Sequence, residues 1–145
     1  ANLGDAYVFD NDLPKAALWY RKALFIADSL QLPKVQNASL YMGLGRIYLL
    51  LEDFEASLNC YQQTEKSFSD LSLNLQAYFL NNYGNYYYYT KDYQTSLKKF
   101  LMLKKLLEKH DKRETFSMYL FRAKAARPCS TVRALRVLST ETDIK

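Results

Sequence analysis

The sequence is poor in the residues that interrupt helices. Its 145 residues include only four Gly and three Pro, which suits long helices joined by short connections. The longest aliphatic run, from Ile47 to Leu51, is far too short to cross a bilayer. We therefore expect an all-α domain with one substantial core and no membrane span within this stretch of chain.

Residues that build reactive centres are scarce as well. Cys60 and Cys129 lie far apart and match no metal-binding or redox spacing, and the single histidine, His110, has no second ligand nearby in the sequence. No glycine-rich phosphate loop and no pairing of a nucleophile with a base occurs. We therefore expect no enzyme, no metal site and no cofactor. We expect a cytoplasmic location, although two cysteines leave an extracytoplasmic (periplasmic) sensor region open.

Charge is distributed unevenly along the chain. Residues 1–97 carry seven basic and ten acidic side chains, a net charge of −3, whereas residues 98–136 carry twelve and three, a net charge of +9. A basic segment favours nucleic acid or another acidic partner. The plainer interpretation is a solvated helix face, because the lysines occur in pairs beside leucines at helical spacing. Nucleic-acid binding by residues 98–136 is therefore the alternative function, ranked second.

The sequence repeats itself with a period of about forty residues. Glycines recur at steps of 41 and 39 residues, and four other positions keep a fixed distance from each glycine. In chain order, the matched sets are Gly4, Gly45 and Gly84; Tyr7, Tyr48 and Tyr87; Asp12, Asp53 and Asp92; Ala16, Ser57 and Ser96; and Tyr20, Tyr61 and Phe100. Five positions kept in register three times predict three copies of one structural unit.

Each unit reads as two amphipathic helices. The glycine and the small residue allow the two helices to approach closely, and the aspartate is suited to cap the second helix. Pro14 is tolerated in a first turn, and Pro33 marks the turn between the first two units. The helices that this pattern predicts are 2–10, 13–31, 35–51, 54–68, 71–90, 93–109, 112–126 and 130–140.

The pattern resembles the tetratricopeptide repeat, in which a large residue is followed by Leu-Gly, Tyr, a later small residue and an aromatic residue. The second unit matches it with Tyr41, Leu44, Gly45, Tyr48, Ser57 and Tyr61. The resemblance implies a right-handed α-solenoid of antiparallel helix pairs with three to four repeats. The expected repeats are 1–33, 34–70, 71–110 and a degenerate closing unit over 111–140, followed by a frayed tail over 141–145.

The repeat period and the incomplete first unit both suggest that the repeats belong to a longer protein. The usual tetratricopeptide period is about 34 residues, and longer periods are similar to those of bacterial sensor and regulatory proteins. The first unit begins only at Leu3-Gly4, without most of its first helix. We therefore expect a fragment of a longer protein, with self-association through exposed ends as a further expectation.

Six of the thirteen tyrosines fall between Asn81 and Tyr93 and divide between two faces of one helix. Tyr83 and Tyr87 lie four residues apart on the side expected to pack on the partner helix, so both are predicted to be core residues. Tyr86 falls between the faces. Residues that recur at three- and four-residue steps form a second stripe, which consists of Tyr78, Asn81, Asn85, Tyr88 and Tyr89.

In the tetratricopeptide family, this second stripe lines the concave groove that receives partner peptides. Transferred to the other units, the same positions add Asp5 and Phe9, then Met42, Arg46 and Leu49, and finally Lys124 in the closing unit. Amides can pair with the backbone of an extended peptide, and tyrosine offers contact area with little entropy to lose. The resemblance thus implies a peptide- or protein-binding scaffold, the regulatory or sensor part of a larger protein.

Overall fold

The computed structural model describes residues 12–110, and every regular element in that range is a helix. In chain order these are α2 (Leu13–Ser29), α3 (Lys34–Leu50), α4 (Phe54–Glu65), the short 3-10 helix η1 (Phe68–Asp70), α5 (Leu73–Tyr89) and α6 (Tyr93–Lys109). The all-α prediction is confirmed for this range, and the long helices lie within a few residues of their predicted bounds. The helices expected over 2–10, 112–126 and 130–140, and the tail, lie outside the described residues.

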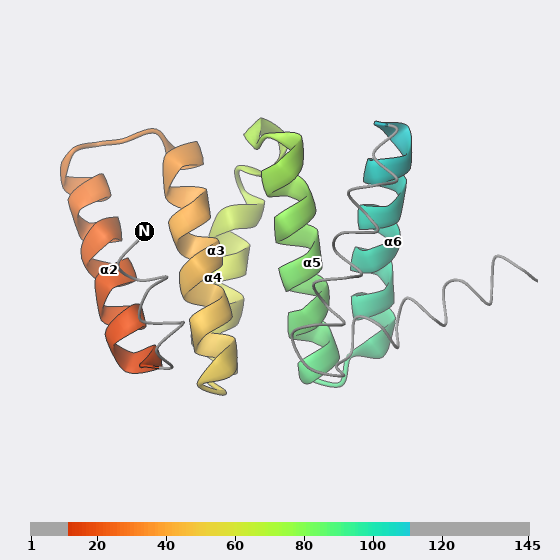
Figure 1. Ribbon diagram of the computed structural model, residues 1–145, viewed down its shortest axis with the longest axis horizontal. Coiled ribbons are helices and arrows are strands. Elements are labelled where there is room, and N and C mark those ends of the chain that lie inside the picture. Colours follow the sequence, from red (N-terminus) through yellow and green to blue (C-terminus); the bar gives the residue numbers. More distant parts are fainter. Residues whose placement is uncertain (1–11, 111–145) are drawn as a thin grey trace, which may run out of the picture. The chain divides into compact units, whose positions relative to one another are not determined.

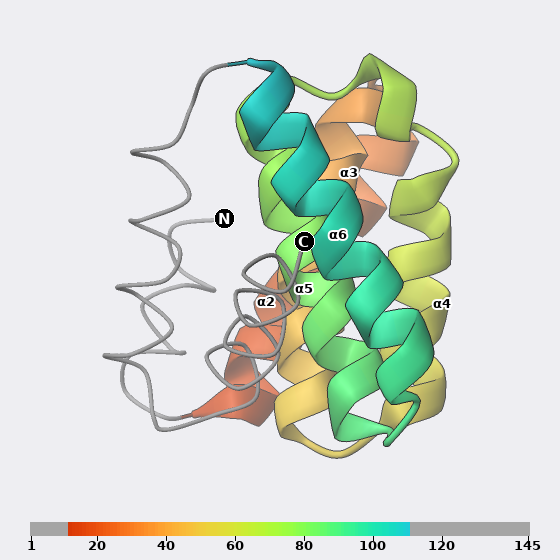
Figure 2. The ribbon, with the colours of Figure 1, turned by 90° about the vertical axis from the view of Figure 1, so that its right-hand side faces the viewer.

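Consecutive helices run antiparallel and pack as neighbours. Backbone contacts divide the chain into two compact units, Ala1–Asn82 (unit 1) and Tyr83–Lys145 (unit 2), and we describe each by itself. In unit 1, α3 packs against both α2 and α4 (Figure 1). In unit 2, the end of α5 and the whole of α6 lie side by side in both views (Figure 1, Figure 2). The described chain is therefore a helical, repeat-like fold.

The second helix of each repeat begins at the aspartate that the sequence marks as its cap. Each carboxylate accepts a hydrogen bond from a backbone N–H three residues further on: Lys15 donates to Asp12 at 3.3 Å, Ala56 to Asp53 at 3.1 Å and Thr95 to Asp92 at 3.1 Å. Such a bond satisfies an N–H group that the helix start leaves without an intrahelical acceptor. Pro14 lies in the first turn of α2, as expected. The capping prediction is confirmed at all three positions.

One tight turn ends α2, α3 and α5. Gln31, Glu52 and Lys91 adopt positive φ angles of 52°, 60° and 66°. The N–H of the following residue bonds to the carbonyl five residues back in every case: Leu32 to Ala27 at 3.0 Å, Asp53 to Tyr48 at 2.9 Å and Asp92 to Tyr87 at 2.9 Å. This is the Schellman arrangement, which usually places glycine at the left-handed residue. The turn also explains why α2 ends at Ser29 and does not continue to Gln31.

Two glycines bring paired helices into close contact. A Cβ atom on Gly45 would lie 3.1 Å from the nearest atom of α4, and one on Gly84 would lie 2.9 Å from the Phe100 ring. Across each contact a serine hydroxyl donates to the glycine carbonyl, Ser57 to Gly45 and Ser96 to Gly84, both at 2.8 Å. A buried hydroxyl needs such a partner, so serine fits where alanine is usual.

The core of unit 1 lies between α2, α3 and α4. Its buried cluster consists of Ala16, Ala17, Tyr20, Leu24, Leu44, Ile47 and Cys60. Tyr48 packs against this cluster but is only partly buried. Tyr61 is fully buried and meets Phe79 of α5 edge to face, with ring centroids 6.4 Å apart.

The end of α4 differs from its predicted position at residue 68. α4 stops at Glu65, and the chain then forms η1 before α5 begins. The Phe68 ring packs against Phe79 with centroids 5.6 Å apart, and Gln76 Nε2 donates to the Phe68 carbonyl at 2.9 Å. These two contacts with α5 draw the chain out of the α4 helix path, which periodicity alone does not indicate.

The core of unit 2 combines α6 leucines with α5 aromatic rings. Phe100, Leu103 and Leu107 are almost completely buried, and Tyr83 and Tyr86 are buried as well. The prediction that Tyr83 is a core residue is confirmed. Tyr87 is only half-buried, which corrects the prediction that it is equally part of the core. It lies near the end of α5, and its hydroxyl donates to the Tyr83 hydroxyl at 3.2 Å.

Three further features bear on which kinds of function the described residues support. None of the helices between residues 12 and 110 combines the length and the apolar composition that a membrane-spanning helix needs. Within the same range, no group of three His, Cys, Asp or Glu residues is placed to hold a metal ion. The thiol of Cys60 is buried, and burial together with the charge of Asp53 raises its pKa to about 11. It is therefore not poised as a nucleophile.

Candidate peptide-binding face

The predicted groove residues separate into accessible, buried and undescribed groups. Asp5, Phe9 and Lys124 lie outside the described residues. Met42 is completely buried and Leu49 is 8% exposed, so neither offers surface to a ligand. We therefore remove both from the candidate face. The accessible members are Arg46, Tyr78, Asn81, Asn85, Tyr88 and Tyr89.

In unit 1, Arg46 and Tyr78 come together from two different helices. Arg46 lies on α3 and is exposed, and its Nη1 donates to the Tyr78 hydroxyl on α5 at 3.5 Å, a long hydrogen bond. Partial desolvation acts to lower the pKa of Arg46, but Tyr78, Tyr20 and Tyr61 together outweigh it, so that the pKa is raised overall. Arg46 thus keeps its charge at any ordinary pH.

A buried amide supports Tyr78. Asn82 Nδ2 donates to the Tyr78 carbonyl at 2.8 Å, one turn back along α5, and Asn82 is buried. Asn81, its neighbour in the sequence, is half-buried, as is Tyr78. Adjacent asparagines on one helix therefore have different roles, because Asn82 faces inward and Asn81 keeps accessible surface. Helical periodicity places Asn81 on the face but predicts no role for Asn82.

In unit 2, the accessible residues form an aromatic cluster at the turn between α5 and α6. Tyr88 meets Tyr93 edge to face with ring centroids 5.3 Å apart, and it meets Tyr89 at 6.3 Å. Tyr89 is 46% exposed and Tyr93 57%. Tyr93 is not among the predicted site residues. It begins α6, the second helix of its repeat, whereas the predicted groove positions lie on the first helix of each repeat. Asn85, on α5, is half-buried and makes polar contacts of its own.

The chemistry of these two surfaces is that of recognition. Phenol hydroxyls, two amides and one guanidinium can donate and accept hydrogen bonds, while the rings offer apolar area. Such a surface suits a polypeptide whose backbone and side chains need both kinds of contact.

The basic segment is described only in its first part. Between Lys98 and His110, the side chains of Lys98, Lys105 and Lys109 are exposed on α6. Lys99 is placed differently, since its Nζ lies 4.5 Å from the centre of the Tyr83 ring. The exposed lysines recur at helical spacing, as a solvated face would, and they also form a positive stripe.

Comparison with models of known protein families and with curated proteins gave no match. The candidate face therefore rests on its residues and on their geometry.

Proposed function

We propose that this chain is a peptide- or protein-binding scaffold of the tetratricopeptide type, acting as the regulatory or sensor part of a larger signalling protein. The single observation that carries the proposal is the Arg46–Tyr78 contact. These residues are 32 positions apart, and the repeat register predicts that both lie on one face. In this proposal, Arg46, Tyr78 and Asn81 hold a peptide on unit 1, and Asn85, Tyr88 and Tyr89 hold a peptide on unit 2.

The arrangement favours an extended peptide that carries an acidic side chain. Arg46 is the only cation among the accessible face residues that the structure describes, and its fork of N–H donors matches a carboxylate. Tyr78 already holds the guanidinium from one side, so less side-chain freedom is lost when a ligand binds. The amide of Asn81 then pairs with the backbone of a peptide on unit 1, and the amide of Asn85 with the backbone of a peptide on unit 2.

The test is a selection of peptides from a random displayed library against the full 145-residue chain. Selected peptides are titrated by fluorescence anisotropy against the parent, Arg46→Ala and Asn85→Ala. We expect Arg46→Ala to weaken peptides held on unit 1, and Asn85→Ala those held on unit 2, by about 1–3 kcal/mol, because a desolvated partner is removed. Thermal unfolding should change little, since neither side chain belongs to the buried core. The matched control is Arg21→Ala, which removes an exposed arginine on α2.

The result that contradicts the proposal is equally definite. Peptides that bind Arg46→Ala and Asn85→Ala as tightly as the parent do not use this face. Peptides that lose affinity for Arg21→Ala instead bind α2. A variant that unfolds at a clearly lower temperature shows that the substituted residue is structural, and the division of α5 into a core side and a binding side then fails.

Nucleic-acid binding is the second candidate, and the exposed lysine stripe of α6 favours it. Lys98, Lys105 and Lys109 could each meet a phosphate. Binding of single-stranded RNA by this stripe should fall steeply as salt rises, and replacing the three lysines by glutamine should reduce the slope by about 2–3. RNA binding that is weak at low salt, or insensitive to these substitutions, excludes this candidate.

A further inference from the structure

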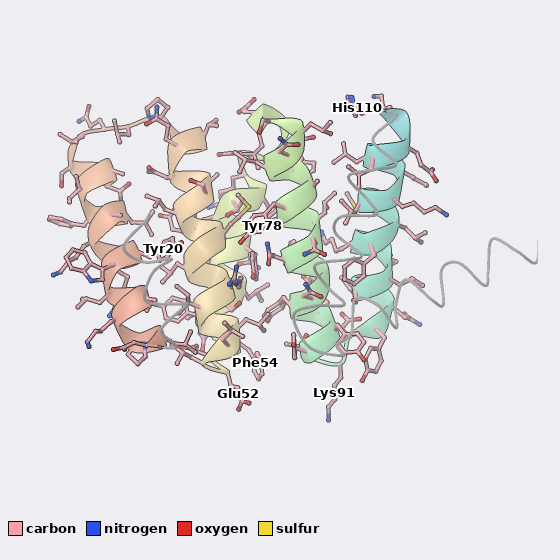
Figure 3. The ribbon with its side chains drawn as sticks, in the orientation of Figure 1. Tyr20, Glu52, Phe54, Tyr78, Lys91 and His110 are labelled. Carbon is pink, nitrogen blue, oxygen red and sulfur yellow. The ribbon has the colours of Figure 1, made fainter. Side chains whose placement is uncertain are left out.

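The outer side of α2 exposes large apolar side chains that no described element covers. Phe25 is 74% exposed, Leu30 66%, Ile26 56% and Leu18 42%. Side chains of α2 also project from its side opposite to α3 in Figure 3. Leu18, Phe25, Ile26 and Leu30 are spaced at i, i+7, i+8 and i+12, so they follow one stripe of the helix. We call these four residues the α2 outer face.

The register of the repeats shows that this face departs from its counterparts in the same chain. Aligned through Ala16, Ser57 and Ser96, the positions of Leu18 and Phe25 correspond to Asn59 and Lys66, and to Lys98 and Lys105. All of these counterparts are exposed, like the α2 residues. At these two positions the second helices of the other two repeats carry polar or basic residues, and only α2 carries apolar ones. Clustered exposed apolar side chains of this size are typical of an interaction surface.

The charged residues beside the α2 outer face indicate the charge that a partner surface should carry. Asp12, at the start of α2, pairs with Lys15 at 2.8 Å, whereas Asp28 accepts from the neutral amide of Asn37 at 3.2 Å and keeps its charge. Arg21 and Lys22 are exposed and form no ion pair within residues 12–110. Because these two cations outnumber the Asp28 carboxylate, the face presents apolar side chains beside a net positive charge, which complements an acidic partner.

The position of Lys22 distinguishes a partner helix from a lipid surface. On the helical wheel, Lys22 lies between Leu18 and Ile26, within the apolar stripe, and its Nζ lies 4.7 Å from the centre of the Trp19 ring. A helix inserted into a bilayer interface keeps its cations on the polar side. A docked helix can instead place a carboxylate opposite Lys22, as charged positions do when they fix the register of paired helices.

We propose that the α2 outer face docks an amphipathic helix of a partner protein, with an apolar stripe flanked by acidic residues. Phe25 and Leu18 contact the apolar stripe, Arg21 at the edge of the face pairs with a flanking carboxylate, and Lys22 pairs with a carboxylate that the partner helix places opposite it. The surface lies on a different helix from Arg46, Tyr78 and Asn81. It therefore stands or falls independently of the peptide-binding face.

The probe is a synthetic helical peptide of about three heptads, with Leu at the a and d positions and Glu at e and g. A second peptide carries Lys in place of Glu. Both are labelled and titrated by fluorescence anisotropy against the full chain at low and high salt. We expect the Glu peptide to bind at least about tenfold more tightly than the Lys peptide. Phe25→Ser should weaken the Glu peptide by about tenfold or more, as for a central hot-spot residue.

Reversing the charge of the α2 outer face should change which peptide binds more tightly, whereas an unfolded variant would lose both peptides. Arg21→Glu combined with Lys22→Glu should transfer the preference from the Glu peptide to the Lys peptide. The matched control is Met102→Ser, which removes an exposed apolar side chain from the position on α6 that corresponds to Lys22. This control should leave both affinities unchanged.

Three outcomes overturn the proposal. The first is equal binding of the Glu and Lys peptides. The second is binding to vesicles of phosphatidylserine that Phe25→Ser abolishes while the Glu peptide does not bind, which assigns the face to lipid. The third is a concentration-dependent dimer in sedimentation equilibrium that Phe25→Ser removes and the Glu peptide does not displace, which assigns the face to a second copy.

Discussion

The close approach of α5 and α6 at Gly84 can be tested by adding a single methyl group. The Gly84→Ala side chain would place its Cβ 2.9 Å from the ring of Phe100, which is completely buried. Overpacking of this kind costs about 1–3 kcal/mol. Alanine also favours a helix interior over glycine by up to about 1 kcal/mol. The clash is the larger effect, so we expect the free energy of unfolding to fall by about 1–2 kcal/mol.

Urea unfolding followed by far-UV circular dichroism measures this change. The midpoint should fall while the slope of free energy against urea stays constant, since one methyl group hardly changes the surface exposed on unfolding. Gln94→Ala is the matched control, because it adds no atom and lies on an exposed part of α6. An unchanged or raised midpoint for Gly84→Ala would refute the close approach of the two helices.

A second substitution separates the clash from other effects. Phe100→Leu replaces the ring that the new methyl group meets with a smaller side chain. By itself this change should lower the free energy of unfolding by on the order of 1 kcal/mol. Combined with Gly84→Ala, it should destabilise by less than the sum of the single changes, with a coupling of at least about 0.5 kcal/mol. Strict additivity of the two changes would show that these residues are not in contact.

Four other predictions follow from the turns, the core and the titratable groups. Lys91→Gly should raise the free energy of unfolding by about 0.5–1 kcal/mol, because the relief of strain at the left-handed residue exceeds the entropy that the unfolded chain gains. A lowered urea midpoint would contradict this. Tyr61→Ala should cost about 3–5 kcal/mol and Tyr87→Ala clearly less, since Tyr61 is fully buried and Tyr87 is not; equal thermal midpoints would contradict the burial difference. Native Cys60 should resist iodoacetamide at pH 8 and react only in urea, because burial raises its pKa to about 11 and keeps the thiol protonated. The Thr95 hydroxyl and N–H hold the pKa of Asp92 below its ordinary value. The contribution of Asp92 to stability is therefore present above about pH 4 and is lost as the pH falls through the folded-state pKa. Asp92→Asn should make acid unfolding less steep in this range, and an unaltered profile would count against the cap.

The helices and their starts could be predicted from the sequence because local signals fix them. Asp12, Asp53 and Asp92 each precede a helix at the same distance from a glycine, and capping depends only on residues within one turn. The left-handed turns were not predicted, because Gln31, Glu52 and Lys91 are not glycine. Their conformation is imposed by the helices on either side and not by residue type.

The candidate face could be predicted only in part, because periodicity gives the direction of a side chain but not what covers it. Met42, Arg46 and Leu49 share one direction on α3, yet Arg46 is exposed and the other two are buried. The opposite difficulty applies to α2. Phe25 and Ile26 read as core residues in a sequence, and only their exposure in the fold shows them to be surface.

The serine-to-glycine hydrogen bonds have a practical consequence for protein engineering. Ser57 and Ser96 hold their helix pairs together from the inner side, through the carbonyls of Gly45 and Gly84, and no outward-facing side chain takes part. The outer residues of a second helix can therefore be exchanged as a set without disturbing its attachment. α6 has the same length as α2, and Lys98 and Lys105 occupy the register of Leu18 and Phe25. Replacing Lys98 and Lys105 by Leu and Phe would therefore transfer the apolar surface of α2 to α6 while the packing of α6 on its partner helix is kept.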